Sequence, residues 1–252
     1  MISKNKIRFI SSLQMKKARD ENNLFVIEGE KIVKEFLEAG IRLKILAATT
    51  EFISTLPSFA LKQIESIETV SYNELKQMSS LKTPHSALAV LEKPNNKIEE
   101  RLPEKLTVAL DCIQDPGNFG TIIRAAAWFG IDTIICSNDC VDVYNPKVVQ
   151  ASMGALLHVK VYYTELMEYL KNINTPVYGT LLNGDSVYNQ RLGNKGIILL
   201  GNESKGISEK LLPFITHKIS IPSYSFTKQG IDSLNVGMAA SIIFSEFYRR
   251  TL

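Results

Sequence analysis

A chain of 252 residues, 45% of them hydrophobic, can bury a substantial core, so disorder is not the expected state. Its 29 Lys and Arg residues against 26 Asp and Glu leave a formal charge of +3, which neither requires nor excludes a nucleic-acid partner. No apolar run is long enough to span a bilayer and no signal-type segment follows Met1. We therefore expect a cytoplasmic protein without a membrane partner.

The N-terminal segment is locally basic, with no acidic residue among the first nineteen. Its cations are Lys4, Lys6, Arg8, Lys16, Lys17 and Arg19. Such a segment could follow a phosphate backbone, or it could be the solvated face of a helix, and the sequence favours neither interpretation.

The metal-binding residue types show no ligand spacing. The cysteines Cys112, Cys136 and Cys140 are odd in number and form no C-x-x-C pair, which favours buried free thiols. The three histidines are scattered along the chain. We therefore expect no metal site.

A small α/β domain is predicted in the first part of the chain. Apolar runs predict strands at 24–29, 43–49 and 87–92, and helical patterns cover 30–40 and the region near 72–79. The charged segment Glu92–Lys105 contains two prolines and no apolar periodicity, as is typical of a linker. We therefore expect one domain at 1–95 and a second at 104–252.

The second domain is predicted to be α/β with a mostly parallel sheet. Strands are expected at 106–113, 131–137, 177–182, 196–202 and 217–222, and helices at 122–129 and 235–250. Ligands of open α/β sheets bind at the carboxyl ends of the strands, which directs attention to the residues that follow each strand.

Two polar segments follow predicted strands. In residues 111–127, Gly117 and Gly120 permit a tight turn, while Asn118 and Arg124 lie where a helix starts, a pattern that ordinary helix-start chemistry also explains. In residues 199–208, Glu203 follows an apolar strand between two glycines, which favours a ligand loop over one that merely caps a helix.

A third segment, residues 219–241, places Ser233 and Asn235 at the start of the last predicted helix, where Ser233 could also act as an N-cap. In this order and at these separations, the three segments resemble the signature motifs of the SpoU (TrmH) RNA 2′-O-ribose methyltransferases of the SPOUT superfamily. Residues 21–33 are similar to that family's substrate-binding domain, itself related to ribosomal proteins that bind kinked RNA.

The resemblance implies a deep trefoil knot in the C-terminal domain, S-adenosylmethionine as cofactor, an RNA substrate and a homodimer formed through the catalytic domains. Ribosomal RNA is a better match than transfer RNA, because the N-terminal domain resembles ribosomal RNA-binding proteins. A non-catalytic relative that acts in ribosome assembly is the alternative from another class. A nicotinamide-dependent enzyme is disfavoured because the G-x-G-x-x-G pattern is absent.

The resemblance also implies roles for single residues. Those matching the family's catalytic positions are Arg124, Asn118, Glu203, Ser233 and Asn235, and those expected at the cofactor are Thr180, Gly201, Ile221 and Leu234. Because a guanidinium stays protonated, we expect Arg124 to bind phosphate and polarise the hydroxyl oxygen rather than to act as a base. The stretch Tyr224–Gly230 is longer than the corresponding loop in many relatives.

Overall fold

The computed structural model describes residues 2–95, 105–223 and 233–249, and it divides the chain into two compact units. Unit 1 combines residues up to Asn95 with Asp142–Leu157, and unit 2 contains the rest of the chain. Most of the predicted linker and the whole stretch Tyr224–Gly230 lie outside the described residues. None of the helices in the described ranges has the length and apolar character that spanning a bilayer requires.

Unit 1 is built on a four-stranded sheet in the order β1-β4-β2-β3. The strands are β1 (Leu24–Glu28), β2 (Ile45–Ala48), β3 (Ile67–Thr69) and β4 (Ala87–Glu92). The helices are α1 (Lys4–Ser12), α2 (Lys16–Asn22), α3 (Glu30–Glu38), α4 (Thr50–Ser54), α5 (Ser58–Leu61) and α6 (Tyr72–Met78). Strand β4 pairs antiparallel with both β1 and β2, and β2 pairs parallel with β3.

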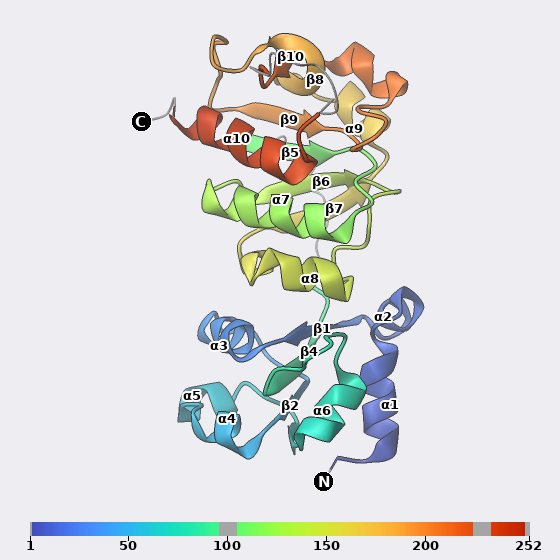
Figure 1. The fold of residues 1–252 in the computed structure, drawn as a ribbon, viewed down its shortest axis with the longest axis vertical. Coiled ribbons are helices and arrows are strands. Elements are labelled where there is room, and N and C mark those ends of the chain that lie inside the picture. The colour runs from blue at the N-terminus through green and yellow to red at the C-terminus, as the bar shows by residue number, and fades with distance from the viewer. Residues whose placement is uncertain (1, 96–104, 224–232, 250–252) are drawn as a thin grey trace. The chain divides into compact units, whose positions relative to one another are not determined.

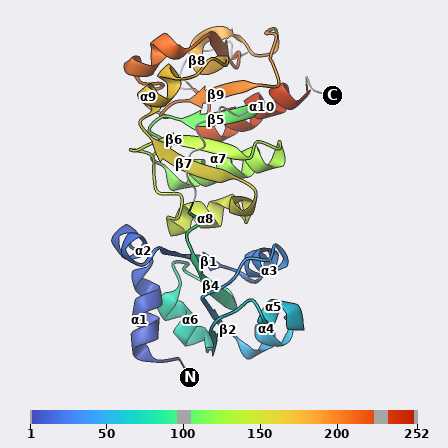
Figure 2. The same cartoon turned by 180° about the vertical axis from the view of Figure 1, so that it is seen from behind.

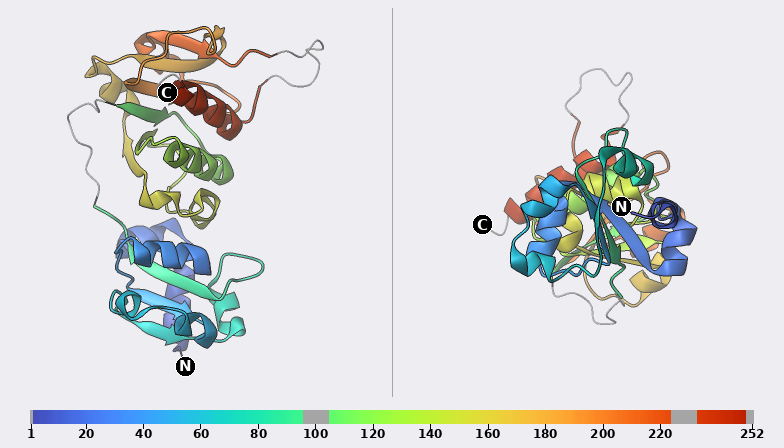
Figure 3. Two further views of the ribbon diagram at one scale, coloured as in Figure 1. Left: turned by 90° about the vertical axis from the view of Figure 1, so that its left-hand side faces the viewer. Right: turned by 90° about the horizontal axis from the view of Figure 1, so that it is seen from below.

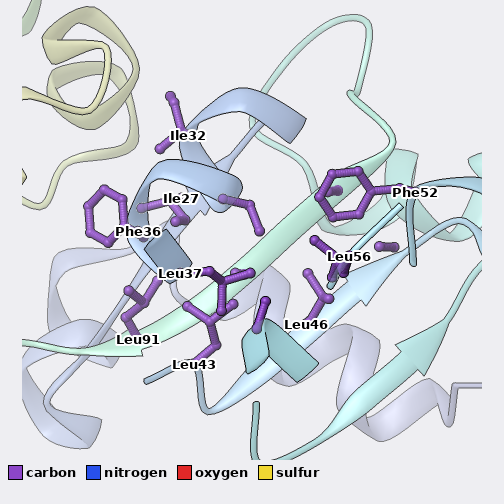
Figure 4. Packing of buried hydrophobic residues seen from close by; sticks show 14 of the residues in the cluster. Ile27, Ile32, Phe36, Leu37, Leu43, Leu46, Phe52, Leu56 and Leu91 are labelled. Carbon is purple, nitrogen blue, oxygen red and sulfur yellow. The ribbon is translucent and has the colours of Figure 1, made fainter. Parts of the chain in front are cut away.

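Helices cover both faces of this sheet, with α3, α4 and α5 on one side and α1 and α6 on the other (Figures 1 and 3). Helix α3 buries Ile32, Val33, Phe36 and Leu37, and this spacing forms one apolar stripe. Figure 4 shows Phe36 and Leu37 from this helix packed with Leu43, Leu46 and Leu91 of the sheet region. The alternation of strand residues between the two faces thus produces two separate cores.

Residues 142–157 belong to unit 1 by their packing, although the predicted boundary places them in the second domain. This segment contains α8 (Pro146–Ser152) and the short 3-10 helix η1 (Ala155–Leu157). Val149 joins the core on the α3 side, and the Tyr144 ring packs against Phe25 with centroids 4.7 Å apart. The domain boundary therefore depends on which distant residues these apolar side chains pack against, and the local sequence pattern does not reveal that.

The basic N-terminal segment is only partly free to meet a phosphate. Arg19 is buried, and its guanidinium binds Asp142 and the carbonyl oxygens of Leu13 and Gln14. Lys6 donates to Ser66 and Glu68. The other four cations of the segment are exposed, which both interpretations allow, while Arg19 is structural.

Unit 2 is a six-stranded parallel sheet in the order β10-β8-β9-β5-β6-β7. The strands are β5 (Leu106–Leu110), β6 (Thr133–Ser137), β7 (Lys160–Thr164), β8 (Val177–Ser186), β9 (Gly196–Leu200) and β10 (His217–Ser220). The helices are α7 (Pro116–Trp128), α9 (Leu166–Lys171), the 3-10 helix η2 (Glu209–Phe214) and α10 (Val236–Arg249). The predicted α/β class with a parallel sheet is confirmed.

Helices α7 and α10 lie side by side on one face of this sheet (Figure 1), and Figure 2 shows the sheet from the opposite side. On that opposite side, α9 and η2 contribute Leu166, Leu170 and Leu211 to a core with β9 residues. Strands β9 and β5 are neighbours although they are far apart in sequence, with Leu110 opposite Leu200. The residues that follow these two strands therefore meet at one edge of the sheet.

Candidate functional site

The first site segment is the turn from β5 into α7. Asp115 caps α7 by accepting the Asn118 backbone N–H at 2.7 Å, and Pro116 occupies the first turn, where its missing N–H costs nothing. These local signals start the helix six residues earlier than the predicted start at Ile122. Asn118 is thereby held in the first turn of α7, with its side chain free to bond outside the helix.

The second site segment is the loop that follows β9. Asn202 and Gly206 exchange backbone hydrogen bonds, so the loop closes on itself within five residues. A Cβ added to Gly201 would lie 2.3 Å from the Gly206 carbonyl carbon and from the Ile207 nitrogen. Only glycine therefore allows the strand end to approach the returning loop this closely.

The third site segment begins α10. Asn235 caps this helix, because its Oδ1 accepts the backbone N–H groups of Gly237 and Met238 at 3.0 and 3.2 Å. The cap is therefore Asn235 rather than Ser233, which is exposed and is the first described residue after the gap at 224–232. Gly237 lets α10 approach α7, since an added Cβ would stand 3.0 Å from the Thr121 methyl group.

One hydrogen-bonded chain connects the three segments. Asn235 Nδ2 donates to Asn118 Oδ1 at 2.7 Å, and Asn118 Nδ2 donates to Glu203 Oε1 at 2.8 Å. The direction is set by the cap, because Asn235 must use its oxygen for the helix and therefore presents its amide nitrogen to Asn118. Three of the five residues expected at catalytic positions are thus in direct contact.

The Glu203 carboxylate is linked to two helix starts through these hydrogen bonds. Asn118 lies in the first turn of α7 and Asn235 at the start of α10. Glu203 is half-buried, and an ionised carboxylate can accept several hydrogen bonds, so capacity remains for a further donor. The arrangement can therefore orient a polar group such as a hydroxyl.

Arg124 is not part of this chain of hydrogen bonds. It is exposed on α7, six residues or about 9 Å along the helix axis from Asn118, on the face that also carries Thr121. Within the described ranges its guanidinium forms no hydrogen bond or ion pair. The charge is therefore available to an anionic ligand.

The four residues expected at the cofactor occupy different environments. Thr180, on β8, donates its hydroxyl to the Leu199 carbonyl oxygen of β9 at 3.1 Å. Gly201 follows β9, and Ile221 lies just beyond β10 and is half-buried. Leu234 is 45% exposed, which is high for a leucine. Gly201 and Ile221 follow the carboxyl ends of two parallel strands, as the ligand rule for such sheets requires.

Two residues outside the expected set organise the site. Asp111 is 2% exposed, and its Oδ2 accepts the Ser208 backbone N–H at 2.6 Å. Asn202 Nδ2 donates to the Cys112 carbonyl oxygen at 2.8 Å. A carboxylate that directly follows a buried apolar strand is a sequence signal for Asp111, whereas nothing local identifies the partner of Asn202.

The thiol of Cys112 is not activated. Burial and the neighbouring Asp139 carboxylate raise the pKa of Cys112 to about 11, so the thiol stays protonated at neutral pH. All three cysteines are free, with Cys136 and Cys140 buried and Cys112 half-buried. Across residues 2–95, 105–223 and 233–249, no three His, Cys, Asp or Glu side chains are grouped to hold a metal ion.

Two protein-family models match this chain. The sequence model of the SpoU rRNA Methylase family matches residues 105–245, and that of the MRM3-like substrate binding domain matches residues 4–89. The chain is 29% identical over 242 residues to the 23S rRNA (guanosine(2553)-2'-O)-methyltransferase RlmP of Bacillus subtilis (strain 168), with 94% of each chain covered.

Two solved structures are similar over nearly the whole chain. One, from Porphyromonas gingivalis and assigned to the TrmH family of RNA methyltransferases, has a TM-score of 0.86 at 37% identity and covers 99% of both chains. The other, an AdoMet-bound rRNA methyltransferase from Sinorhizobium meliloti, has a TM-score of 0.87 at 25% identity and covers 100% of this chain and 97% of that one. With a family match over more than half of its length, this chain belongs to the SpoU rRNA methylase family.

Proposed function

We propose that this protein transfers a methyl group from S-adenosylmethionine to a ribose 2′-hydroxyl of ribosomal RNA. The observation that carries the proposal is the chain from Asn235 through Asn118 to Glu203, which joins the three motif segments at one edge of the sheet. The relative from Bacillus subtilis is named for this reaction on 23S rRNA, and the relative from Sinorhizobium meliloti is AdoMet-bound.

The residues at the expected cofactor loops fit S-adenosylmethionine. An adenosine group is held by apolar surface and a few polar groups, and Leu234 and Ile221 offer incompletely buried aliphatic side chains here. Gly201 adds no side chain above the end of β9. When bound, S-adenosylmethionine supplies a methyl group that the positive charge on sulfur already activates.

The protein's own task is then to orient an oxygen nucleophile and to manage its proton. A guanidinium is a permanent cation, so Arg124 binds an RNA phosphate and polarises the hydroxyl oxygen, and deprotonation of that hydroxyl is late or passes to solvent. Asn118, which Asn235 holds in turn, binds Glu203 from one side and leaves the remaining acceptor positions of the carboxylate for the ribose or the surrounding loop. Ser233 adds a hydroxyl at the start of the same segment.

The two domains have different roles in this proposal, as in the family. Residues 1–95 bind the RNA substrate and residues 104–252 carry the catalytic site with a trefoil knot, in a protein that works in the cytoplasm.

We further propose a homodimer formed through the catalytic domains. Three exposed apolar side chains on α7 and α10 support this dimer: Trp128 at 84%, Met238 at 58% and Tyr248 at 48% exposure. Replacing Trp128 by Glu should shift the sedimentation coefficient from dimer to monomer, and an unchanged value contradicts the interface.

Methyl transfer to purified RNA tests the reaction. Tritiated S-adenosylmethionine is incubated with the protein and with either ribosomal RNA or transfer RNA from cells that lack the gene. We expect label at an alkali-resistant dinucleotide of ribosomal RNA, as 2′-O-methylation requires. Label only in transfer RNA favours the tRNA enzyme, and no label together with no calorimetric binding of S-adenosylmethionine favours the non-catalytic relative.

The same assay tests Arg124. Replacing Arg124 by Ala should reduce transfer by more than about 100-fold while the Kd for S-adenosylmethionine changes by less than about threefold. The matched control is Arg191→Ala, which removes another exposed guanidinium of unit 2. Full activity of the Arg124 variant contradicts the assignment.

A further inference from the structure

Both polar atoms of the Asn202 side-chain amide form hydrogen bonds. Its Oδ1 accepts the backbone N–H groups of Ser204 and Lys205, each at 3.0 Å, and its Nδ2 donates to the Cys112 carbonyl oxygen at 2.8 Å. The first pair of bonds shapes the turn that carries Glu203. The second bond leaves the loop and reaches the end of β5.

The peptide that receives this bond is in an unusual conformation. Cys112 has a φ of +58°, a left-handed value that the Cβ of a cysteine disfavours. Its N–H donates to Ser137 Oγ at 2.8 Å, and that hydroxyl in turn donates to Asp139. Cys112 is therefore held from both sides, by Ser137 at the end of β6 and by Asn202 after β9, which is how a disfavoured backbone conformation persists.

The far end of the loop is attached to the preceding residue. Ser208 N–H donates to the buried carboxylate of Asp111, so both ends of the loop are fixed to two consecutive residues at the end of β5. The chain runs from there directly into α7, which carries Asn118. These two hydrogen bonds and the short segment between β5 and α7 thus set the distance from Glu203 to Asn118.

We propose that Asn202 is a positioning residue that holds Glu203 opposite Asn118 by fixing the left-handed Cys112 turn. This inference rests on the proposed methyl transfer. When the bond to Cys112 is lost, the turn relaxes and Glu203 moves relative to Asn118, so the catalytic rate falls. The loop itself keeps its shape as long as Oδ1 still accepts the two N–H groups.

The replacement Asn202→Asp distinguishes the acceptor role of the side chain from its donor role. A carboxylate still accepts from Ser204 and Lys205, but it cannot donate to a carbonyl. We expect kcat to fall about 10- to 100-fold, with less than a threefold change in the Kd for S-adenosylmethionine. Asn202→Ala should lose both functions and reduce cofactor affinity as well. The matched control is Asn172→Asp, which removes a similar donation from an Asn side chain to the Glu168 carbonyl oxygen.

A second-site replacement distinguishes positioning from general destabilisation. Glycine adopts the left-handed conformation without a Cβ penalty, so Cys112→Gly keeps the turn when Asn202 no longer holds it. We expect kcat of the double variant Asn202→Asp/Cys112→Gly to be at least tenfold higher than that of Asn202→Asp. Where Asn202→Asp loses less than tenfold, the double variant should regain the wild-type kcat. Wild-type kcat in Asn202→Asp, or a loss that Cys112→Gly leaves unchanged, overturns the proposal.

An NMR signature keeps this inference separate from the proposed function. The Asn118 side-chain amide resonances report the bond to Glu203. They should shift in Asn202→Asp, return in the double variant and stay unchanged in Asn172→Asp. If the wild type transfers no methyl group, the proposed function fails while these resonances still decide the positioning role; unshifted resonances in Asn202→Asp refute it.

Discussion

Replacing Arg19 by Met should strongly destabilise unit 1. The guanidinium is 2% exposed and binds Asp142 through Nε and Nη2 at 3.1 and 2.5 Å. Its Nη1 also donates to the carbonyl oxygens of Leu13 and Gln14 at 2.9 and 2.7 Å. Methionine fills much of the volume but leaves one carboxylate and two carbonyl oxygens without these bonds.

The expected magnitude follows from burial. Removing one partner of a buried ion pair costs about 3–5 kcal/mol, because the remaining charge loses its compensation. For a domain of this size, about 1 kcal/mol corresponds to a Tm shift of roughly 4 °C, so the unit 1 transition should fall by roughly 12–20 °C. Asp142→Asn is expected to cost less, since Asp142 is 12% exposed and an asparagine oxygen can still accept from Arg19.

Hydrogen exchange with mass spectrometry resolves the effect by unit, and thermal unfolding gives its size. Faster exchange should appear in β1, α2 and residues 142–157 before it appears in unit 2. The control Lys17→Met removes a cation that is 85% exposed and 3.8 Å from Glu21, and it should leave the Tm unchanged. A Tm change below about 3 °C in Arg19→Met, or equal exchange in both units, refutes the claim that this pair holds residues 142–157 in unit 1.

Three further predictions concern single residues. Gly201→Ala should weaken S-adenosylmethionine binding by at least about tenfold in calorimetry, because the new Cβ would lie 2.3 Å from the Gly206 backbone; unchanged affinity contradicts this. Since burial raises the pKa of Cys112 from 9.0 to about 11, the unfolded thiol ionises first, so the stabilisation from the protonated thiol is complete below pH 9 and is lost as pH rises through 11. Cys112→Ala should therefore flatten the alkaline loss of stability, whereas parallel denaturation curves count against the shift. Ser71→Ala removes a capping box with Glu74 and should lower the free energy of unfolding by about 1 kcal/mol in urea titrations; an effect below about 0.3 kcal/mol would mean that the cap contributes little.

Strand and helix periodicity located most of the strands in both sheets. Strands β1, β4, β5 and β9 agree with their predicted ranges within a few residues, because each forms a nearly continuous apolar run. Strand β7 was missed, and its residues are mostly half-buried at the sheet edge. An edge strand buries less of each side chain, so its hydrophobic pattern is weak.

The residues expected at catalytic positions were chosen through motif order, which left open whether Glu203 contacts Asn118 or Arg124. Asn118 and Glu203 are 85 positions apart and bond because β9 lies beside β5, a neighbour relation that crosses three intervening strands in sequence. Asn202 passed unnoticed for the same reason, since its partner is the carbonyl group of Cys112, and a backbone acceptor leaves no mark on residue type.

By itself, the sequence determined the α/β class, the parallel character of the second sheet and the polar residues at the strand ends, because burial and turn chemistry act over a few neighbouring residues. Tertiary structure alone decided that residues 142–157 complete unit 1, that Arg19 is buried and that Asn202 joins the Cys112 turn. These outcomes depend on which distant surfaces meet, and that choice reflects the free energy of the whole packed chain rather than any local pattern.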